Sequence, residues 1–268
     1  MEARMSEPVP VDQAEAHRYG SAAIVLHWLS GLIVLVMIGT GWWMLELIHD
    51  PARRAEAFPF FKFHKSLGFL ILAITIARIG WRLTHRPPSL PARMPGWERI
   101  SAFAAQAMFY TLLLVIPLSG WMYISTEWAE ALDKQFKGDT FFFGLFAVPY
   151  FAPIAEAGED VRRTLSFHLS GVHAWMAYGL LVLVALHAGA ALKHHVIERD
   201  NVLAHMLPFL RRTSEDLPED AARRGGLGSL TVWIIAIAVV GAVAFSGWVA
   251  NDPPRQQGAA ASQAASGK

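Results

Sequence analysis

Cysteine is absent from the 268 residues of this chain. Its absence excludes disulfides, thiolate metal sites, iron–sulfur clusters, covalent c-type haem attachment and cysteine nucleophiles. Charged residues are also scarce, at 17% of the chain, against roughly 25% in an average soluble domain. The formal net charge is only +1, so the chain offers no single-sign field that would attract nucleic acid. The eleven histidines remain as the main ligand type for a redox metal.

Apolar residues make up 54% of the chain and are gathered into long blocks. A helix needs about 20 mostly apolar residues to cross the roughly 30 Å hydrocarbon core of a bilayer. Five stretches meet this requirement: 22–45, 64–83, 101–125, 171–192 and 229–250. Because only helices and closed barrels satisfy their backbone groups in lipid, the sequence predicts an all-α membrane protein.

The distribution of lysine and arginine predicts how these helices are oriented. The basic residues that follow the second span are Arg82, Arg86, Arg93 and Arg99. The loop 126–168 is instead net acidic, with an aromatic run at 141–146 that is typical of a membrane surface. We therefore expect residues 1–21 and the connection 209–228 in the cytoplasm, and the loop and the C-terminus outside. Residues 251–268 have the composition of a flexible linker or tail.

Histidine inside a membrane span is costly and points to a functional site. Four histidines lie within the spans or at their edges: His27, His64, His173 and His187. His173 and His187 are 14 residues apart on one helix, which puts them about 40° apart on its face and about 21 Å apart along its axis. His168 competes for the outer position, but it lies about 100° away from the His187 face, so His173 is favoured.

Depth in the membrane assigns partners to these histidines. His27 and His187 are both expected near the inner surface, and His64 and His173 near the outer surface. Two facing imidazoles without a carboxylate or thiolate suit an iron porphyrin with both axial positions filled, whereas zinc needs three or four protein ligands. A single intramembrane histidine is more often a hydrogen-bonding residue or an interfacial anchor, but four that pair consistently favour haem ligation.

Glycines recur beside two of these histidines. Gly31 follows His27 by four residues, and Gly68 follows His64 by four, so each lies one helical turn from its histidine on the same face. A flat macrocycle bound at the histidine would need such a position without a side chain. The alternative is that these glycines only allow close packing between helices.

Two basic residues could serve the same sites. Lys65 adjoins His64 at the outer surface, and Arg78 lies in the inner half of the second span. Either could pair with a haem propionate or with a quinone carbonyl. For Lys65, interfacial snorkelling is an equal alternative. Arg78 is deeper, and a buried cation is hard to explain without an anionic partner.

With these residues in view, the chain resembles the prokaryotic cytochrome b561 family over roughly residues 17–208. The motifs that carry the resemblance are Arg18-Tyr19, Leu26-His27-Trp28-Leu29, His64-Lys65-Ser66-Leu67-Gly68, Arg78, Trp81-Arg82, Pro117-Leu118-Ser119-Gly120-Trp121, His173, Leu186-His187-Ala188-Gly189, Lys193-His194-His195, Arg199-Asp200-Asn201 and His205-Met206-Leu207-Pro208. The long acidic loop, the fifth span and the C-terminal tail depart from the shorter family members.

The resemblance implies a four-helix transmembrane haem-binding bundle at 22–208, followed here by a fifth transmembrane helix, in the bacterial inner membrane. It implies two b-type haems with His27, His64, His173 and His187 as axial ligands to the haem iron. It further implies electron exchange with quinone, with superoxide or another periplasmic molecule as the donor. Some relatives carry a fused periplasmic lipid-binding domain, and the tail 251–268 would suit such a fusion.

The leading interpretation is a di-haem b-type membrane cytochrome that carries electrons across the inner membrane. Two filled axial positions leave no open site for oxygen, so the iron is expected to shuttle single electrons. One alternative is a haem b anchor subunit of a larger oxidoreductase of the hydrogenase or formate dehydrogenase type, with a large soluble partner. Another is a haem-free transporter or scaffold, which would be colourless. The sequence leaves open whether the chain is only a carrier or a quinone-linked oxidoreductase.

Overall fold

Four long helices dominate the computed structural model, which describes residues 19–85, 87, 94–198, 202–207, 238, 240–245 and 247. They are α2 (Ser21–His49), α3 (Arg54–Thr84), α4 (Gly96–Ile124) and α6 (Glu159–Lys193). All four are long and apolar enough to cross a membrane. The predicted all-α membrane architecture with four spanning helices is therefore confirmed, because each helix carries its own backbone hydrogen bonds through the lipid.

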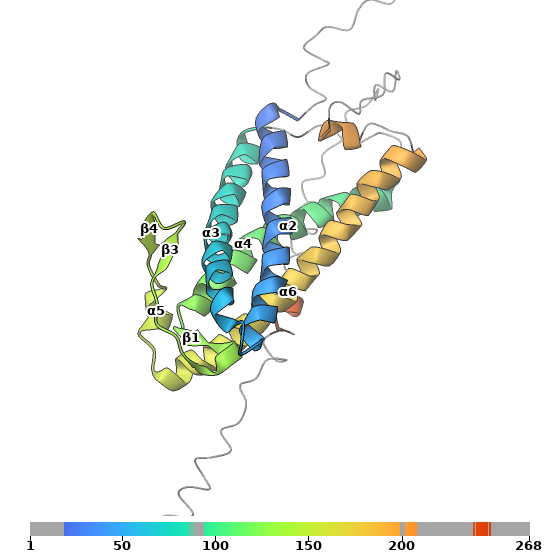
Figure 1. Cartoon of the computed structure of the whole chain (residues 1–268). Helices are drawn as coiled ribbons and strands as arrows, with labels where there is room; N and C mark the ends of the chain where they lie inside the picture. The colour runs from blue at the N-terminus through green and yellow to red at the C-terminus, as the bar shows by residue number, and fades with distance from the viewer. Residues whose placement is uncertain are drawn as a thin grey trace, which may run out of the picture.

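The helices pack mainly as two pairs. α2 runs beside α3, and α4 packs most extensively against α6 (Figure 1). Buried aliphatic side chains from all four helices meet between them and form one core. Its members are Ile33, Val34, Leu67, Ile71, Ile74, Leu112, Leu113, Ile116, Met176, Leu180, Leu183 and, from the segment after the bundle, Val240.

Two helices are longer than the apolar runs that predict them. α3 begins at Arg54, ten residues before the predicted span 64–83, and α6 begins at Glu159, twelve residues before the predicted span 171–192. The added turns are charged at their starts, with Glu56 in the first turn of α3. These turns therefore extend the helices past the apolar zone, where they support the loop region.

The outer loop is folded from residue 126 to residue 158, and we call this segment the outer cap. It contains two antiparallel hairpins, β1 (Trp128–Ala129) with β2 (Lys134–Gln135) and β3 (Thr140–Phe142) with β4 (Phe146–Val148). A short 3-10 helix, η1 (Glu130–Leu132), joins the first pair, and α5 (Ala152–Ala155) follows the second. The last part of the predicted loop 126–168 belongs to α6.

Two arginines at the start of α6 attach the outer cap to the bundle. Arg162 Nη1 donates to Glu127 Oε2 over 2.8 Å, and both side chains are largely buried, with 10% and 18% exposed. Arg163 binds both carboxylate oxygens of Asp133, at 2.8 and 2.7 Å, nearer to solvent. The arginines thus join α6 to two points of the cap that lie far earlier in the chain.

The chain after α6 turns back toward the bundle. A π-helical turn, η2 (His194–Glu198), follows directly, and a 3-10 turn, η3 (Leu203–His205), comes next. The indole Nε1 of Trp28 donates to the Met206 carbonyl over 2.8 Å, which ties this segment to α2. The predicted connection 209–228, the tail 251–268 and residues 1–18 of the N-terminal segment lie outside the described residues.

Of the predicted fifth span 229–250, the structure describes residues 238, 240–245 and 247, all of them helical. These residues pack on α6. A Cβ added to Gly247 would lie only 2.5 Å from the Gly171 carbonyl oxygen, so the two backbones are in direct contact there. At Gly179, an added Cβ would lie 3.9 Å from Val243. Glycine is required at 247 because any side chain would collide with the α6 backbone.

Candidate functional site

The four histidines lie as two facing pairs within the bundle. The imidazole centres of His64, from α3, and His173, from α6, are 6.2 Å apart with their planes at 68°. Those of His27, from α2, and His187, from α6, are 6.1 Å apart with their planes at 61°. The structure thus brings each histidine to the partner that the sequence predicts. Their role as ligands remains a prediction.

Hydrogen bonds fix the ring of His173. Its Nδ1 lies 3.0 Å from the Ile116 carbonyl oxygen and 3.1 Å from Ser119 Oγ, both on α4. Ser119 Oγ in turn donates to the same carbonyl over 2.7 Å. Because a carbonyl can only accept, Nδ1 carries the proton, and in a neutral imidazole the lone pair is then on Nε2. His173 is therefore held in the tautomer that a metal ligand needs.

His64 shows the same division of roles between its two nitrogens. Thr40 Oγ1 lies 3.4 Å from its Nδ1. Its Nε2 is buried and has no hydrogen-bond partner. A buried polar atom without a partner costs roughly 1–3 kcal/mol. A ligand bound at this nitrogen would remove that cost.

The inner pair is more open than the outer pair. His27 is half-buried and His187 is exposed, whereas both His64 and His173 are half-buried. The ring of Phe109, from α4, packs edge-on against His187 with centres 5.3 Å apart. Trp28 lies beside His27 and is bonded to Met206, so the segment after α6 covers this end of the site.

The spacing within each pair accommodates one metal ion between two imidazoles. With a metal–nitrogen bond of about 2.0 Å and a ring nitrogen about 1.1 Å from its ring centre, two imidazoles that held one ion between them would have centres about 6.2 Å apart. Edge-to-face aromatic contact allows a similar separation, but it leaves Nε2 of His64 without a partner. Within the described residues, no group of three or more His, Cys, Asp or Glu could hold a metal. The pairs thus fit a group that brings its own in-plane ligands, as a porphyrin does.

The glycines near the histidines fall into two kinds. A Cβ added at Gly31 would meet nothing within 4 Å, and one at Gly68 would make only an ordinary contact with Met37, at 3.7 Å. Gly31 therefore borders open space, and Gly68 borders the flexible end of a methionine side chain. Gly120, which sequence reasoning missed, lies closer, because an added Cβ would be 3.1 Å from Cε1 of His173. Gly120 therefore lets α4 approach the outer pair.

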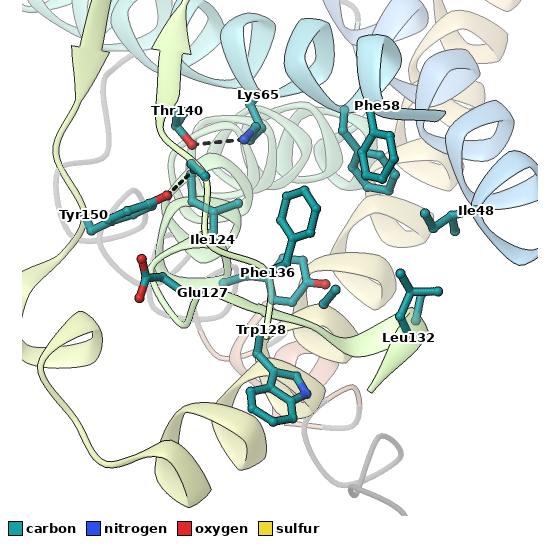
Figure 2. A pocket seen from close by; sticks show the side chains of 15 residues that line it. Ile48, Phe58, Lys65, Ile124, Glu127, Trp128, Leu132, Phe136, Thr140 and Tyr150 are labelled. Atoms are coloured by element: carbon teal, nitrogen blue, oxygen red, sulfur yellow. Dashed lines mark hydrogen bonds between the residues drawn. The ribbon is translucent and has the colours of Figure 1, made fainter. Parts of the chain in front are cut away.

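Lys65 points away from the histidine pair and into the outer cap. Its ammonium group donates to Thr140 Oγ1 over 3.0 Å (Figure 2). Both residues line a mostly apolar cavity of about 110 Å³ between the outer ends of α2, α3 and α4 and the cap. Figure 2 shows Tyr150 beside Thr140, and Glu127 beneath Tyr150, on the same side of the cavity. Burial raises the pKa of the Tyr150 hydroxyl, which stays neutral and donates to the Gly138 carbonyl.

Arg78 lies close to the inner pair. Its guanidinium carbon is 5.8 Å from the ring centre of Tyr110, and its charge acts on both His27 and His187. Among the residues that the structure describes, no carboxylate pairs with Arg78. A half-buried cation beside two neutral imidazoles is an unfavourable arrangement unless an anion binds there.

Sequence reasoning missed the residues that contact the four histidines. Ile116 and Ser119 bond His173, Thr40 contacts His64, and Phe109 packs on His187. The only signal for Ser119 and Gly120 is their place in the motif Pro117-Leu118-Ser119-Gly120-Trp121. A backbone carbonyl such as that of Ile116 leaves no signal in a sequence, because every residue has one.

Comparison with known proteins places these features in a family context. A family model described as prokaryotic cytochrome b561 matches residues 18–209. The chain is 35% identical over 191 residues to cytochrome b561 homolog 2 of Escherichia coli (strain K12), covering 71% of this chain and 91% of that protein. It is 25% identical over 200 residues to cytochrome b561 homolog 1 of the same organism, covering 72% and 98%. It is 27% identical over 196 residues to the probable superoxide oxidase CybB of Yersinia pestis, covering 72% and 98%.

Proposed function

This chain belongs to the prokaryotic cytochrome b561 family of membrane haem proteins, and from that premise we propose that it is a di-haem electron carrier linking quinone to a periplasmic donor. The observation that supports two haems is the presence of two histidine pairs on the same bundle. The shared helix α6 separates them by 14 residues, or about 21 Å. One pair would therefore lie near each membrane surface, as transfer across the bilayer requires.

In this proposal, His27 and His187 would hold the inner haem, and His64 and His173 the outer one. When bound, haem b supplies a reversible one-electron couple. The protein would orient the ligand nitrogens, and the Ile116 carbonyl does so directly by accepting a hydrogen bond from Nδ1–H of His173. Two histidines at each site would hold the iron without leaving a position for oxygen, and the group would then supply electron transfer.

The nearby predicted residues receive secondary roles. Arg78 would pair with a haem carboxylate or a quinone oxygen at the inner site, because its charge lies beside that pair and no described carboxylate neutralises it. A fixed cation also favours the reduced state of a redox group beside it. Gly31 and Gly68 would leave room for the flat macrocycle. Lys65 receives no such role, because its ammonium group is bonded to Thr140 in the outer cap and points away from the histidine pair.

The electron donor is proposed by analogy with one relative. One relative carries the name probable superoxide oxidase, so we propose superoxide, an anion, as the periplasmic donor, with another small periplasmic reductant as the alternative. The acceptor proposed is ubiquinone dissolved in the bilayer. The proposed setting is the bacterial inner membrane, with the N-terminus in the cytoplasm and the outer cap in the periplasm.

The test uses the full chain in lipid nanodiscs. A dithionite-reduced-minus-oxidised spectrum with haem quantification is expected to show two b haems per chain. Adding a soluble ubiquinone analogue to the reduced protein is then expected to reoxidise them. A colourless preparation, or one haem per chain, would contradict the di-haem proposal. If the quinone analogue does not reoxidise the reduced haem, the proposed role of quinone is contradicted. A large soluble subunit that co-purifies would favour the anchor-subunit alternative.

We also propose that the segment 229–250 is a fifth transmembrane helix that runs antiparallel to α6. Two contacts support this direction: Gly247 lies at Gly171, near the outer end of α6, and Val243 lies at Gly179, deeper in the bundle. The helix would then end outside, which puts the C-terminal tail in the periplasm.

Single cysteines test this topology cleanly, because the natural chain has none. In intact cells, Ser262→Cys is expected to react with a membrane-impermeant maleimide, whereas Ser6→Cys should react only after the inner membrane is permeabilised. The readout is gel-shift labelling of the purified chain. Equal protection of both cysteines in intact cells would contradict the fifth span and leave an even number of crossings.

A further inference from the structure

The outer cap contains one segment of different chemistry from the rest. From Thr140 to Ala155 no residue is charged, and the segment contains five phenylalanines and a tyrosine. The cap on either side is acidic, with Asp139 directly before this segment and Glu156 directly after it. The neutral segment folds as the β3–β4 hairpin followed by α5.

The hairpin folds back along α3 toward the middle of the bundle. Figure 1 shows the two strands beside α3, with their turn directed away from the rest of the cap. Ser66 of α3 holds it there: Phe143 N donates to Ser66 Oγ over 3.0 Å, and Ser66 Oγ lies 3.2 Å from the Phe141 carbonyl. The ring of Phe63 also meets that of Phe143, with centres 6.3 Å apart.

These contacts set the depth of the hairpin. Ser66 is twelve residues into α3, about 18 Å from the start of that helix. It is also two residues from His64, the outer histidine, and lies inside the predicted span 64–83. The hairpin tip therefore lies at the level where α3 is already in the membrane.

The side chains at this level point outward and are apolar. Leu145 is 76% exposed, Phe146 56% and Phe141 47%. The loop of three residues between the paired Phe142 and Phe146 has positive φ at Phe143 (46°) and Gly144 (76°), and Leu145 N closes the turn by donating to the Phe142 carbonyl over 2.8 Å. A left-handed backbone is uncommon for phenylalanine. Phe143 adopts it and adds one more aromatic ring to the hairpin tip.

We propose that the β3–β4 hairpin is inserted into the outer leaflet of the bilayer and anchors the outer cap there through lipid contact. Its exposed aromatic and aliphatic side chains continue the lipid-facing surface of α3, and aromatic rings are favoured at the membrane–water interface. The strands pair with each other from Thr140–Val148 to Phe142–Phe146, and Ser66 contacts the backbone of β3. Many backbone N–H and C=O groups of the hairpin therefore have hydrogen-bond partners at a depth where water is scarce.

The anchor has a consequence for the outer site. The hairpin bonds Ser66 directly and bonds Lys65 through Thr140, and both residues adjoin His64. Lipid insertion of the hairpin would therefore hold the segment of α3 that carries the outer histidine. The inference requires that α3 spans the membrane and does not depend on haem or quinone.

A spin label at the tip tests the insertion. Leu145→Cys removes no packing, and the labelled full chain is placed in nanodiscs of phosphatidylcholine and phosphatidylglycerol. Power saturation is expected to show a label that is several-fold more accessible to oxygen than to a water-soluble nickel complex. The matched control is Lys137→Cys, an exposed residue of the same cap, which should show the reverse preference.

Two results would overturn the proposal. If the label at 145 is as accessible to the nickel complex as the label at 137, the hairpin lies in water. If the label at 145 is shielded from both reagents and shows dipolar coupling between chains, the hairpin is an interface with a second copy. Circular dichroism and size-exclusion profiles that match the wild type exclude misfolding as the cause of either result.

Discussion

Replacing His187 or His173 by alanine is expected to remove haem from one site and leave the other loaded, so each variant should retain about half of the wild-type haem. Each alanine would remove one of the two proposed ligands at a site, and the partner histidine alone would be a weaker anchor for the group. The two sites are separated along α6 by about 21 Å and share no ligand, so their losses should be independent. The measurement is the pyridine haemochrome content per chain of protein purified in detergent.

The controls for this prediction are other histidines of the chain. His168→Ala should keep the full haem content, although His168 is buried and lies only five residues from His173. His49→Ala, at the exposed end of α2, should do the same. The double variant His173→Ala/His187→Ala should be colourless. Haem loss in His168→Ala that equals the loss in His173→Ala would contradict the assignment of the outer pair.

Replacing Arg162 by alanine is expected to open the outer cap. The change leaves the Glu127 carboxylate, whose side chain is 18% exposed, without its partner. Loss of one member of a largely buried ion pair costs about 3 kcal/mol, which corresponds to about a hundredfold more of the open state. Cleavage by an endoproteinase specific for lysine, at Lys134 and Lys137 in the cap, should accelerate by that factor because it follows the open population.

The neighbouring arginine is the matched control. Arg163 pairs with Asp133, whose side chain is 39% exposed, so Arg163→Ala should accelerate cleavage less than about fivefold. Arg163 lowers the pKa of Asp133, so this pair stabilises the cap above the unfolded-state pKa of about 3.9. That contribution is lost as the pH falls through the lowered pKa of the folded state. Equal cleavage rates in both variants would contradict a special role for the Arg162–Glu127 pair.

The helices and the pairing of the histidines follow from local properties of the sequence. A spanning helix must be long and apolar, and it advances by a fixed rotation and rise at each residue. The positions of His173 and His187 along one helix were therefore predictable, as were their partners at matching depth. The resemblance to the cytochrome b561 family rests on the same local motifs and is confirmed by the family match over residues 18–209.

The bounds of these helices were less predictable. An apolar run indicates which residues lie in lipid, but it does not indicate where the helix begins or ends. The predicted starts at 64 and 171 fall ten and twelve residues inside α3 and α6. Charged turns at Arg54 and Glu159 continue those helices into the cap. Helix formation outside lipid depends on what the turns pack against, which a hydropathy pattern does not contain.

What the sequence determined by itself is the membrane class, the four spanning helices and the two sets of histidines, since these depend on neighbours along one helix. Only the tertiary structure decided which atoms orient the histidines and how the loop folds. The Ile116 carbonyl meets His173 from 57 positions away, and Ser66 meets Phe143 from 77 positions away. Such contacts depend on how α4, α6 and the cap pack together in three dimensions, because nothing in the covalent chain brings distant residues to one place.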